Sequence, residues 1–250
     1  MSYKEENQRT EMLLGAAAMK KLQNARVAVF GVGGVGGYLC EALARAGVGA
    51  IDLFDNDVVS RSNINRQIIA LHSTVGRPKV DVMRERILDI NPECLVRAYQ
   101  TFYLPENADG YPLDGYDYIA DAVDTVVAKI ELAVRAENAG VPIIAAMGAG
   151  NKLDPTRFAV TDLFATSGCP LARVMRRELK ARGIKKLKVV FSDEPAAARP
   201  DDAPVCTVSG DSDSHDETAR KKSPPASLSF VPSVMGLIMA GEIVKDIVGV

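Results

Sequence analysis

The sequence predicts an α/β protein with a Rossmann-like, doubly wound, mainly parallel sheet and a smaller C-terminal lobe. Short apolar runs alternate with segments of helical spacing, and the first of these runs leads directly into the glycine-rich turn GVGGVGG. Of the 250 residues, 47% are hydrophobic and 25% are charged, as in ordinary soluble domains. A chain of this length buries roughly 70–75% of its surface on folding, so it needs neither disulfides nor a structural metal.

Each expected strand is a short apolar run that ends at turn-forming residues, and each expected helix has apolar side chains at helical spacing. Gly47 ends the first helix, Pro78 stands in the first turn of the second, and Asn91 with Pro92 ends it. Strands are expected at 27–30, 50–54, 94–99, 116–120, 141–146, 157–161 and 187–191. Helices are expected at 38–46, 77–90, 127–139, 169–182 and 234–248.

The pattern changes after 147–150, which divides the chain into a nucleotide-binding domain, 1–150, and a substrate lobe, 151–250. Residues 194–226 hold Pro, Ser, Asp and Lys with few large apolar side chains, which predicts a mobile loop. The apolar helix at 234–248 is too short and too interrupted by glycines and charges to span a bilayer. We therefore expect this helix to pack back on the sheet.

The cysteines and the apolar segments exclude several classes of protein. Cysteines stand at 40, 94, 169 and 206, and no two are within four residues, which excludes a CxxC redox motif and a paired-CxxC zinc site. No run of 18 apolar residues occurs and the sequence begins with polar MSYKEENQRTEM, so neither a membrane span nor a secretion signal is expected. We expect a cytoplasmic protein with reduced thiols.

The glycine-rich turn predicts a nucleotide site. Glycines have no Cβ, so backbone N–H groups can approach phosphate and ribose at the start of a helix. Asp55 follows at the end of the second strand, where a carboxylate accepts hydrogen bonds from ribose hydroxyls. The alternative is a tight turn that binds nothing. The glycines concerned are Gly31, Gly33, Gly34 and Gly36.

Two cations further along the chain, Arg66 and Lys79, favour a polyphosphate over NAD as the ligand. Lys79 stands in the first turn of a helix, where the helix dipole opposes a cation by up to about 1 kcal/mol unless an anion shares the site. We expect Lys79 to be exposed and to bind phosphate; solvated surface charges are the alternative. Asp124, after the fourth strand, is a candidate either for holding Mg²⁺ or for N-capping the next helix. No GxxxxGKS or GxxxxGKT motif occurs, which excludes a P-loop.

Five motifs, in this order and spacing, resemble those of the ThiF-type, ubiquitin-activating-like adenylating family. They are GVGGVG at 31–36, FDND at 54–57, SNINRQ at 62–67, GRPK at 76–79 and AVDT at 122–125, and the match covers residues 9–150. The segments GAGNKLDPTRF, SGCPLARVMRREL and SFVPSVMGLIMAGEIVKD are similar to the branch that dehydrates a threonylcarbamoyl-modified adenosine in the tRNA anticodon loop. The similarity then extends over nearly the whole chain.

The resemblance implies an enzyme that uses ATP and Mg²⁺, with 1–150 as its ATP-binding adenylation domain. It would transfer AMP to the threonylcarbamoyl carboxylate with loss of pyrophosphate, and a neighbouring group of the same modification would then close a ring and release AMP. Asp55 would bind ribose, Asp124 would lie at Mg²⁺ and the α-phosphate, and Arg9 would reach the phosphates across a homodimer. Without the resemblance, Arg9 is an ordinary surface charge. The other residues implied at the nucleotide are Asp57, Asn63, Arg66, Gln67 and Lys79.

Charge is segregated along the chain. Between 171 and 190, eight basic residues accompany one acid, Glu178, so this segment carries +7, whereas the whole chain carries −2 and the remainder therefore −9. A basic helix in an otherwise acidic protein predicts a surface for the tRNA backbone; a solvated charged face is the alternative. DNA and membranes are not expected as partners. The candidate tRNA-binding residues are Arg173, Arg176, Arg177, Lys180, Lys185 and Lys186, with Arg220, Lys221 and Lys222 as a second choice.

Three other functions stay open. Some enzymes of the same family activate the C-terminal carboxylate of a ubiquitin-like sulfur carrier, and Cys169 is then a candidate for a thioester, although an incidental thiol is the simpler interpretation. An NAD-dependent oxidoreductase leaves Arg66, Lys79 and Asp124 without a task. A non-catalytic tRNA-binding scaffold leaves the five motifs unexplained. No role is assigned to His72, His215 or Cys206, and a modification partner protein cannot be named.

Overall fold

The computed structural model describes residues 5–198, 200, 202 and 225–250, and these form one seven-stranded sheet. The strands are β1 (Arg26–Phe30), β2 (Ala50–Phe54), β3 (Leu95–Tyr99), β4 (Tyr118–Asp121), β5 (Ile143–Ala146), β6 (Phe158–Asp162) and β7 (Lys188–Ser192). Their order is β3-β2-β1-β4-β5-β7-β6, and each neighbouring pair is parallel except β6 with β7. The predicted doubly wound, mainly parallel sheet is confirmed.

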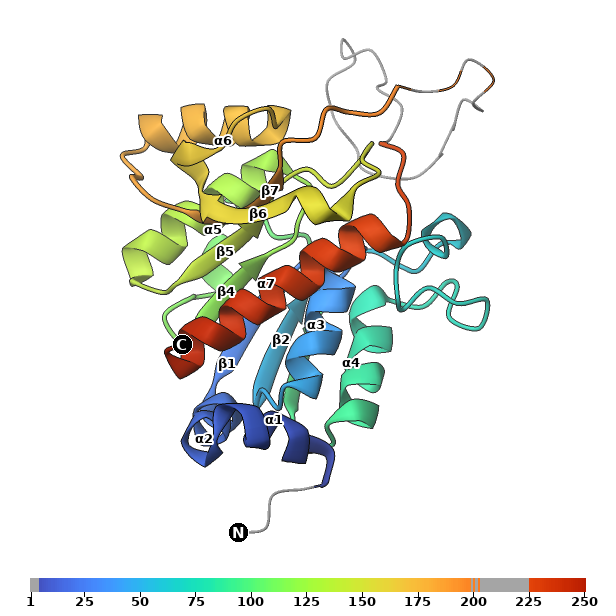
Figure 1. Cartoon of the computed structure of the whole chain (residues 1–250), viewed down its shortest axis with the longest axis vertical. Helices are drawn as coiled ribbons and strands as arrows, with labels where there is room; N and C mark the ends of the chain where they lie inside the picture. The colour runs from blue at the N-terminus through green and yellow to red at the C-terminus, as the bar shows by residue number, and fades with distance from the viewer. Residues whose placement is uncertain (1–4, 199, 201, 203–224) are drawn as a thin grey trace.

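Helices cover both faces of the sheet (Figure 1). On one face lie α3 (Gly36–Arg45), α4 (Lys79–Ile90) and α7 (Phe230–Val248), and on the other lie α5 (Val126–Ala139) and α6 (Pro170–Ala181). Successive residues of a strand point to opposite faces. In β1, Val27 and Val29 pack in the core that includes α3 and α7, whereas Ala28 and Phe30 pack in the core that includes α5. Burial on both faces explains why this strand is apolar throughout.

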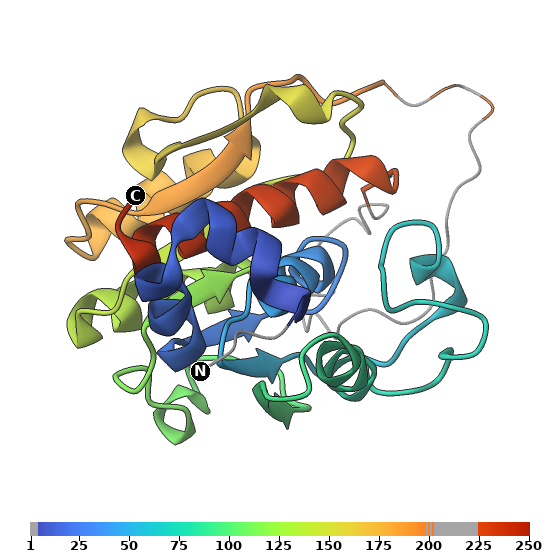
Figure 2. The same cartoon turned by 60° about the horizontal axis from the view of Figure 1, so that its bottom comes forward.

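The C-terminal helix α7 crosses α3 and contacts β4, β5 and β7 (Figures 1 and 2). The two helices approach closely, since a Cβ on Gly236 would lie 2.2 Å from the carbonyl oxygen of Val35. The helix begins at Phe230, four residues before the predicted start at 234, with Pro232 in its first turn. Proline is tolerated there because the first N–H groups of a helix have no partner within the helix.

Two N-terminal helices, α1 (Gln8–Leu14) and α2 (Ala16–Asn24), were not predicted; they lie beside the amino ends of the strands (Figure 2). A Cβ on Gly47, in the turn before β2, would lie 3.4 Å from Asn7 Oδ1, so the start of α1 borders this turn. Short 3-10 helices occur at η1 (Glu5–Asn7), η2 (Arg61–Asn63), η3 (Ala108–Gly110), η4 (Pro155–Arg157) and η5 (Leu163–Ala165).

The strand order changes direction between β1 and β4, and the register aligns the ends of the strands there. Phe30, the last residue of β1, pairs with Phe54 of β2 and with Asp121 of β4. The segments after these three strands therefore leave the sheet at the same level. In open parallel sheets, ligands bind at the carboxyl edge where the strand order reverses. The glycine-rich loop and the turn after β4 flank this place.

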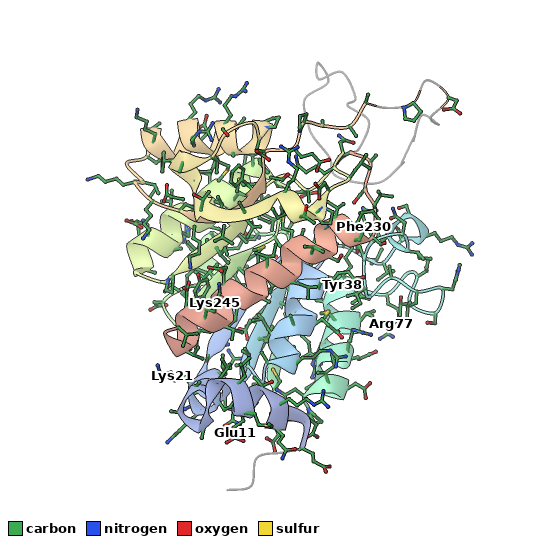
Figure 3. All side chains as sticks on the ribbon, viewed as in Figure 1. Glu11, Lys21, Tyr38, Arg77, Phe230 and Lys245 are labelled. Atoms are coloured by element: carbon green, nitrogen blue, oxygen red, sulfur yellow. The ribbon has the colours of Figure 1, made fainter. Side chains whose placement is uncertain are left out.

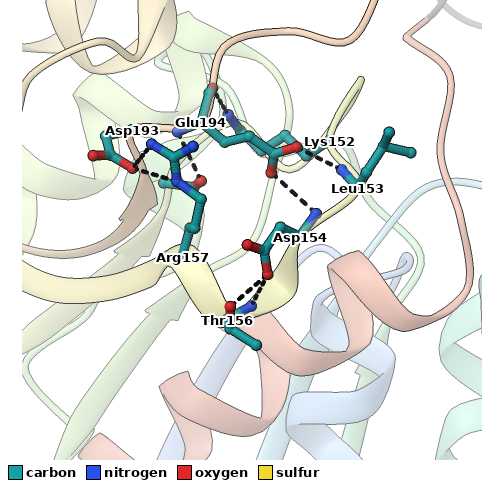
Figure 4. A network of polar contacts seen from close by, with 8 residues as sticks. Lys152, Leu153, Asp154, Thr156, Arg157, Asp193 and Glu194 are labelled. Atoms are coloured by element: carbon teal, nitrogen blue, oxygen red, sulfur yellow. Dashed lines mark hydrogen bonds and ion pairs between the residues drawn. The ribbon is translucent and has the colours of Figure 1, made fainter.

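Beyond β5, the same edge is fixed by a polar network that joins residues 152–157 to 193–194 (Figure 4). The Glu194 carboxylate accepts the backbone N–H groups of Leu153 and Asp154 at 2.8 and 3.2 Å, and the Lys152 ammonium donates to the Glu194 carbonyl at 2.6 Å. Arg157 pairs with Asp193 at 2.8 Å. Most of the predicted mobile loop, 194–226, lies outside the described residues, as do Cys206, His215, Arg220, Lys221 and Lys222. Within the described residues, no helix is long and apolar enough to cross a membrane.

Candidate active site

The glycine-rich loop closes tightly between β1 and α3. Gly31 has a φ of 89°, and a Cβ there would lie 2.6 Å from the Ala122 carbonyl oxygen. A Cβ on Gly36 would lie 1.8 Å from the Gly31 carbonyl oxygen. The packing of the chain itself therefore requires glycine at both positions. It does not require glycine at Gly33, where a Cβ would meet Gln67 Nε2 at an ordinary 3.8 Å.

The structure brings Arg66 to this loop. A Cβ on Gly34 would lie 3.6 Å from Arg66 Cγ and 3.2 Å from the Pro232 side chain at the start of α7. The Arg66 guanidinium donates to Asn65 Oδ1 at 3.0 Å, and Asn65 Nδ2 donates to the Ser227 carbonyl at 3.1 Å. Asn65 thus orients Arg66 and ties it to the segment before α7. Asn65 was not predicted as a site residue, because its partner lies 162 residues away in the chain.

Asp55 is anchored to the loop by its own carboxylate. Oδ2 accepts the backbone N–H of Val32 at 2.7 Å, and Oδ1 accepts that of Asp57 at 2.9 Å. Burial raises the pKa of Asp55, while the positive charge of Lys79 and the two N–H donors oppose the rise. Each carboxylate oxygen has a further lone pair, so the group can still accept hydroxyl donors.

Lys79 lies in the first turn of α4, as predicted, although the helix begins at Lys79 itself and not at Arg77. The prediction that Lys79 is exposed is wrong. The residue is only 5% exposed, and its ammonium pairs with Asp57 Oδ2 at 2.6 Å. The backbone brings the two together, since Lys79 N–H also donates to the Asp57 carbonyl at 3.0 Å. A residue of FDND therefore holds the lysine of GRPK beside the carboxyl edge of β2. The Asp57 side chain is 40% exposed, so this ion pair is open to solvent on one side.

Asn63 and Gln67 are both buried, on either side of Arg66 in the chain. Asn63 Oδ1 accepts the Ser60 backbone N–H at 3.0 Å, which closes a capping box over η2. Gln67 Oε1 has no hydrogen-bond partner among the described residues. A buried acceptor without a partner is uncommon and calls for a ligand or a water.

Asp124 is exposed on the turn between β4 and α5. The residue that N-caps α5 is Thr125, so the alternative that Asp124 caps this helix does not hold. The Asp124 carboxylate accepts the Thr125 hydroxyl at 3.3 Å and forms no ion pair within the described part of the chain. Its charge is therefore available to a ligand at the edge between β1 and β4.

Lys129 was not predicted at this site. It is fully buried in α5, 3.0 Å from Oδ1 of Asp121, which is itself buried at the end of β4. Charged residues are almost never fully buried unless paired, so sequence reasoning assigns a lone lysine in a helix to the surface.

Arg9 lies far from these residues in its own chain. It is exposed on α1, which stands beside the amino ends of the strands, whereas the glycine loop stands at the carboxyl ends. Figure 3 shows the same separation: Glu11 of α1 lies at the bottom of the molecule, whereas Phe230, at the start of the helix whose Pro232 borders Gly34, lies above the middle. The structure does not bring Arg9 to the other predicted residues.

The six candidate residues of the basic segment fall into two groups. Arg173, Lys180, Lys185 and Lys186 are exposed and form no ion pair with the described residues. Arg176 donates to the carbonyl and hydroxyl oxygens of Thr166, and Arg177 pairs with Glu178 at 2.7 Å. The predicted helix is confirmed as α6, but a structural contact already occupies the Arg176 guanidinium.

The thiols and the described histidine lie outside this site. Cys40, Cys94 and Cys169 are free and buried, and burial raises the pKa of Cys94 to about 11. Cys169 is 3% exposed, which does not suit a thiol that forms a thioester with a protein substrate. His72 is exposed on the surface. The described residues contain no group of three or more His, Cys, Asp or Glu that could hold a metal.

Comparison with known proteins gives a consistent result. The ThiF family model matches residues 6–250. A Bacillus subtilis (strain 168) protein named tRNA threonylcarbamoyladenosine dehydratase is 47% identical over 241 residues, 96% of this chain and 93% of that protein. The crystal structure of Escherichia coli tRNA N6-threonylcarbamoyladenosine dehydratase with AMP matches with a TM-score of 0.85 and 34% identity, covering 100% of this chain and 98% of that chain. The same enzyme with ATP matches with a TM-score of 0.84, 33% identity and the same coverage.

Proposed function

The chain belongs to the ThiF family, and from this membership we propose that it is an ATP-dependent tRNA threonylcarbamoyladenosine dehydratase. The near full-length relationship to a protein of that name carries the proposal. The fold supports it, since the five motifs converge at one sheet edge. The alternative, activation of a ubiquitin-like sulfur carrier, is not favoured, because the relatives that match over nearly the whole chain are named dehydratases.

Adenylation solves the chemical problem of this substrate. A carboxylate resists nucleophilic attack because it is already negative, and transfer of AMP turns it into an acyl phosphate with a good leaving group. Negative charge then develops on the departing pyrophosphate, where Lys79 and Arg66 would stabilise it. Asp57 holds the Lys79 ammonium at 2.6 Å before the nucleotide arrives, so the cation is already oriented. Asp55 would accept the ribose hydroxyls.

The described residues could hold Mg²⁺ only together with phosphate oxygens of the nucleotide. It is commonly bound through one or two carboxylates together with phosphate oxygens, and Asp124 offers one exposed carboxylate. No larger acidic cluster is found in the described residues, so Asp124 with the phosphates would hold the ion. When bound, Mg²⁺ would neutralise charge on the phosphates during adenylation.

The second step needs no cysteine. In the threonylcarbamoyl group, the nucleophile that closes the ring is tethered to the activated carboxylate, and the effective concentration of such a neighbour can replace a separate nucleophile. The burial of Cys169 agrees with this. The products are the cyclised nucleoside, AMP and pyrophosphate, with one water lost from the modification.

We further propose that the enzyme is a homodimer in which Arg9 serves the other subunit's site. Arg9 is exposed at the opposite end of the sheet from its own glycine loop, and the five residues of β2 alone span roughly 17 Å. Met12 and Leu13 beside it are 81% and 84% exposed, and a second copy would cover them. Mixing inactive Arg9→Ala and Asp124→Ala chains should restore activity, because some mixed sites hold both residues. Absence of complementation after proven subunit exchange would contradict the proposal.

The tRNA backbone would contact the exposed basic residues of α6 and the segment after it. Phosphates attract lysine and arginine without sequence preference, and Arg173, Lys180, Lys185 and Lys186 are unpaired within the described chain. A tRNA-modifying enzyme works where tRNA resides, and we place this one in the cytoplasm.

Substrate dependence tests the function. AMP release from ATP should require tRNA that carries the threonylcarbamoyl group, and an unmodified transcript of the same tRNA should give none. A sulfur-carrier protein with a free C-terminal carboxylate is the second control. If the carrier stimulated AMP release and the modified tRNA did not, the proposal would be wrong.

A further inference from the structure

The turn after β4 is held by a buried ion pair that the adenylation chemistry does not use. Lys129 Nζ lies 3.0 Å from Asp121 Oδ1, and the two side chains are 0% and 1% exposed. The same ammonium donates to the Val123 carbonyl at 3.1 Å, and the Val123 N–H donates to Asp121 Oδ1 at 3.2 Å. These three contacts hold the backbone of the turn at Val123.

This pair is a poor device for stability alone. Removing two charges from water is costly, and buried pairs can often be replaced by apolar residues without loss of stability. The pairing is also incomplete, since Asp121 Oδ2 has no hydrogen-bond partner among the described residues. Burial raises the pKa of Asp121, and the charge of Lys129 opposes that rise. The presence of this ion pair is better explained by the turn after β4, which it holds in place.

The two ends of the turn are held differently. The Ala122 N–H donates to the Phe30 carbonyl at 2.8 Å and its carbonyl packs against Gly31, so the end beside the glycine loop is held by β1 without Lys129. Asp124 leaves the turn one residue after Val123 and has only the Thr125 hydroxyl as a described partner. The place from which the Asp124 side chain leaves the turn therefore depends on the backbone at Val123, whose carbonyl Lys129 holds at 3.1 Å.

We propose that Lys129 is a positioning residue, whose ammonium holds Asp121 and the Val123 carbonyl so that Asp124 faces the nucleotide. The inference rests on the proposed function, because it gives Asp124 a task in adenylation. It adds a residue that touches neither ATP nor tRNA. The residue acts through Asp124.

A double-mutant cycle tests this dependence. Lys129→Met should lower the kcat of AMP release with modified tRNA roughly ten- to hundredfold, as expected for a misplaced catalytic group. The KM for ATP should change less than about threefold, because Asp55 and Lys79, which would bind the nucleotide, are positioned by the segment after β2 and not by the turn after β4. In the Asp124→Asn background, the same change should cost less than about threefold, since the group that it positions is already lost.

Two further variants separate positioning from folding. Leu132 is buried one turn further along α5. Leu132→Ala removes buried packing, so it should lower the melting temperature while leaving kcat near that of the wild type. If Lys129→Met does not fold, Lys129→Met with Asp121→Asn removes both charges and should fold, yet retain the loss of kcat. AMP affinity, measured by calorimetry without Mg²⁺, should stay within about threefold in each variant.

The outcomes are distinct. Equal losses from Lys129→Met in the wild-type and Asp124→Asn backgrounds would overturn the inference, as would an equal loss of kcat in Leu132→Ala. Full kcat in the charge-free double variant would also overturn it. An inactive wild type with modified tRNA would instead refute the proposed function, and the inference with it.

Discussion

Replacement of Lys79 by methionine separates its role in binding from its role in folding. Methionine keeps most of the apolar stem and removes the charge. The lost ion pair is intermediate between an exposed and a buried one, because Lys79 is 7% exposed by side chain and Asp57 is 40% exposed. Exposed pairs contribute about 0.2–1 kcal/mol, and breaking buried pairs costs about 3–5 kcal/mol. We expect a cost of about 1–2 kcal/mol because water can solvate the remaining Asp57 carboxylate.

That cost corresponds to a fall in melting temperature of about 2–8 °C for a chain of this size. AMP release should fall far more, by about 10²–10³-fold, because the charge stabilises the leaving pyrophosphate. The matched control is Arg77→Met, which removes an exposed cation two residues earlier whose partner is Glu85. This control should keep nearly full activity. Lys79→Met with more than about a tenth of wild-type activity, or Arg77→Met with an equal loss, would refute the phosphate assignment.

Two further predictions concern the ribose acid and the tRNA surface. Because burial raises the pKa of Asp55, the carboxylate takes up its proton at a higher pH than an ordinary aspartate, whose pKa is about 3.9. ATP affinity measured by calorimetry should therefore weaken as pH falls while still above that value, and Asp55→Asn should be weak at every pH; a wild-type affinity unchanged down to about pH 4 would contradict this. Charge reversal of Lys180, Lys185 and Lys186 to Glu should weaken tRNA binding and flatten its logarithmic salt slope by about 2, at about 0.7 per phosphate, with ATP affinity unchanged. Arg176→Gln should lower the melting temperature and leave the tRNA affinity unchanged. An unchanged melting temperature with a weakened tRNA affinity would place Arg176 on the tRNA surface.

The parts of the site that the sequence predicts are those with local signals. Strand β1, its glycine turn and Asp55 lie within a single βαβ unit, where apolar runs and glycines determine the geometry over short distances. The parallel sheet then brings the segments after β1, β2 and β4 to the same edge, so the grouping of Asp55 with Asp124 also follows from topology.

The features that the sequence does not predict depend on contacts between distant residues. Lys79 is buried because the chain between β2 and α4 folds back, with Val58 and Pro78 forming a bridge and the Val59 N–H donating to the Arg77 carbonyl at 2.8 Å. Composition gives no sign of this loop. Likewise, Lys129 is buried because Asp121 ends the adjacent strand, a pairing that becomes visible only when helix and strand are packed together.

Helix α1 was missed for a different reason. It has no fully buried residue: Met12 and Leu13 are exposed, and only Leu14, at its last position, packs against the core. An amphipathic pattern identifies a helix by the face that it buries in its own chain. A helix whose apolar side chains stay largely exposed in its own chain gives no such signal.

The mass of the modified nucleoside shows whether the protein is a dehydratase. The protein is incubated with ATP, Mg²⁺ and tRNA that carries threonylcarbamoyladenosine, and the digested nucleosides are analysed by mass spectrometry under conditions that preserve the ring. We expect that the threonylcarbamoyl nucleoside loses the mass of one water, that the loss requires ATP, and that AMP forms in equal amount. An unchanged nucleoside, with a wild-type enzyme that binds ATP and this tRNA, would contradict it.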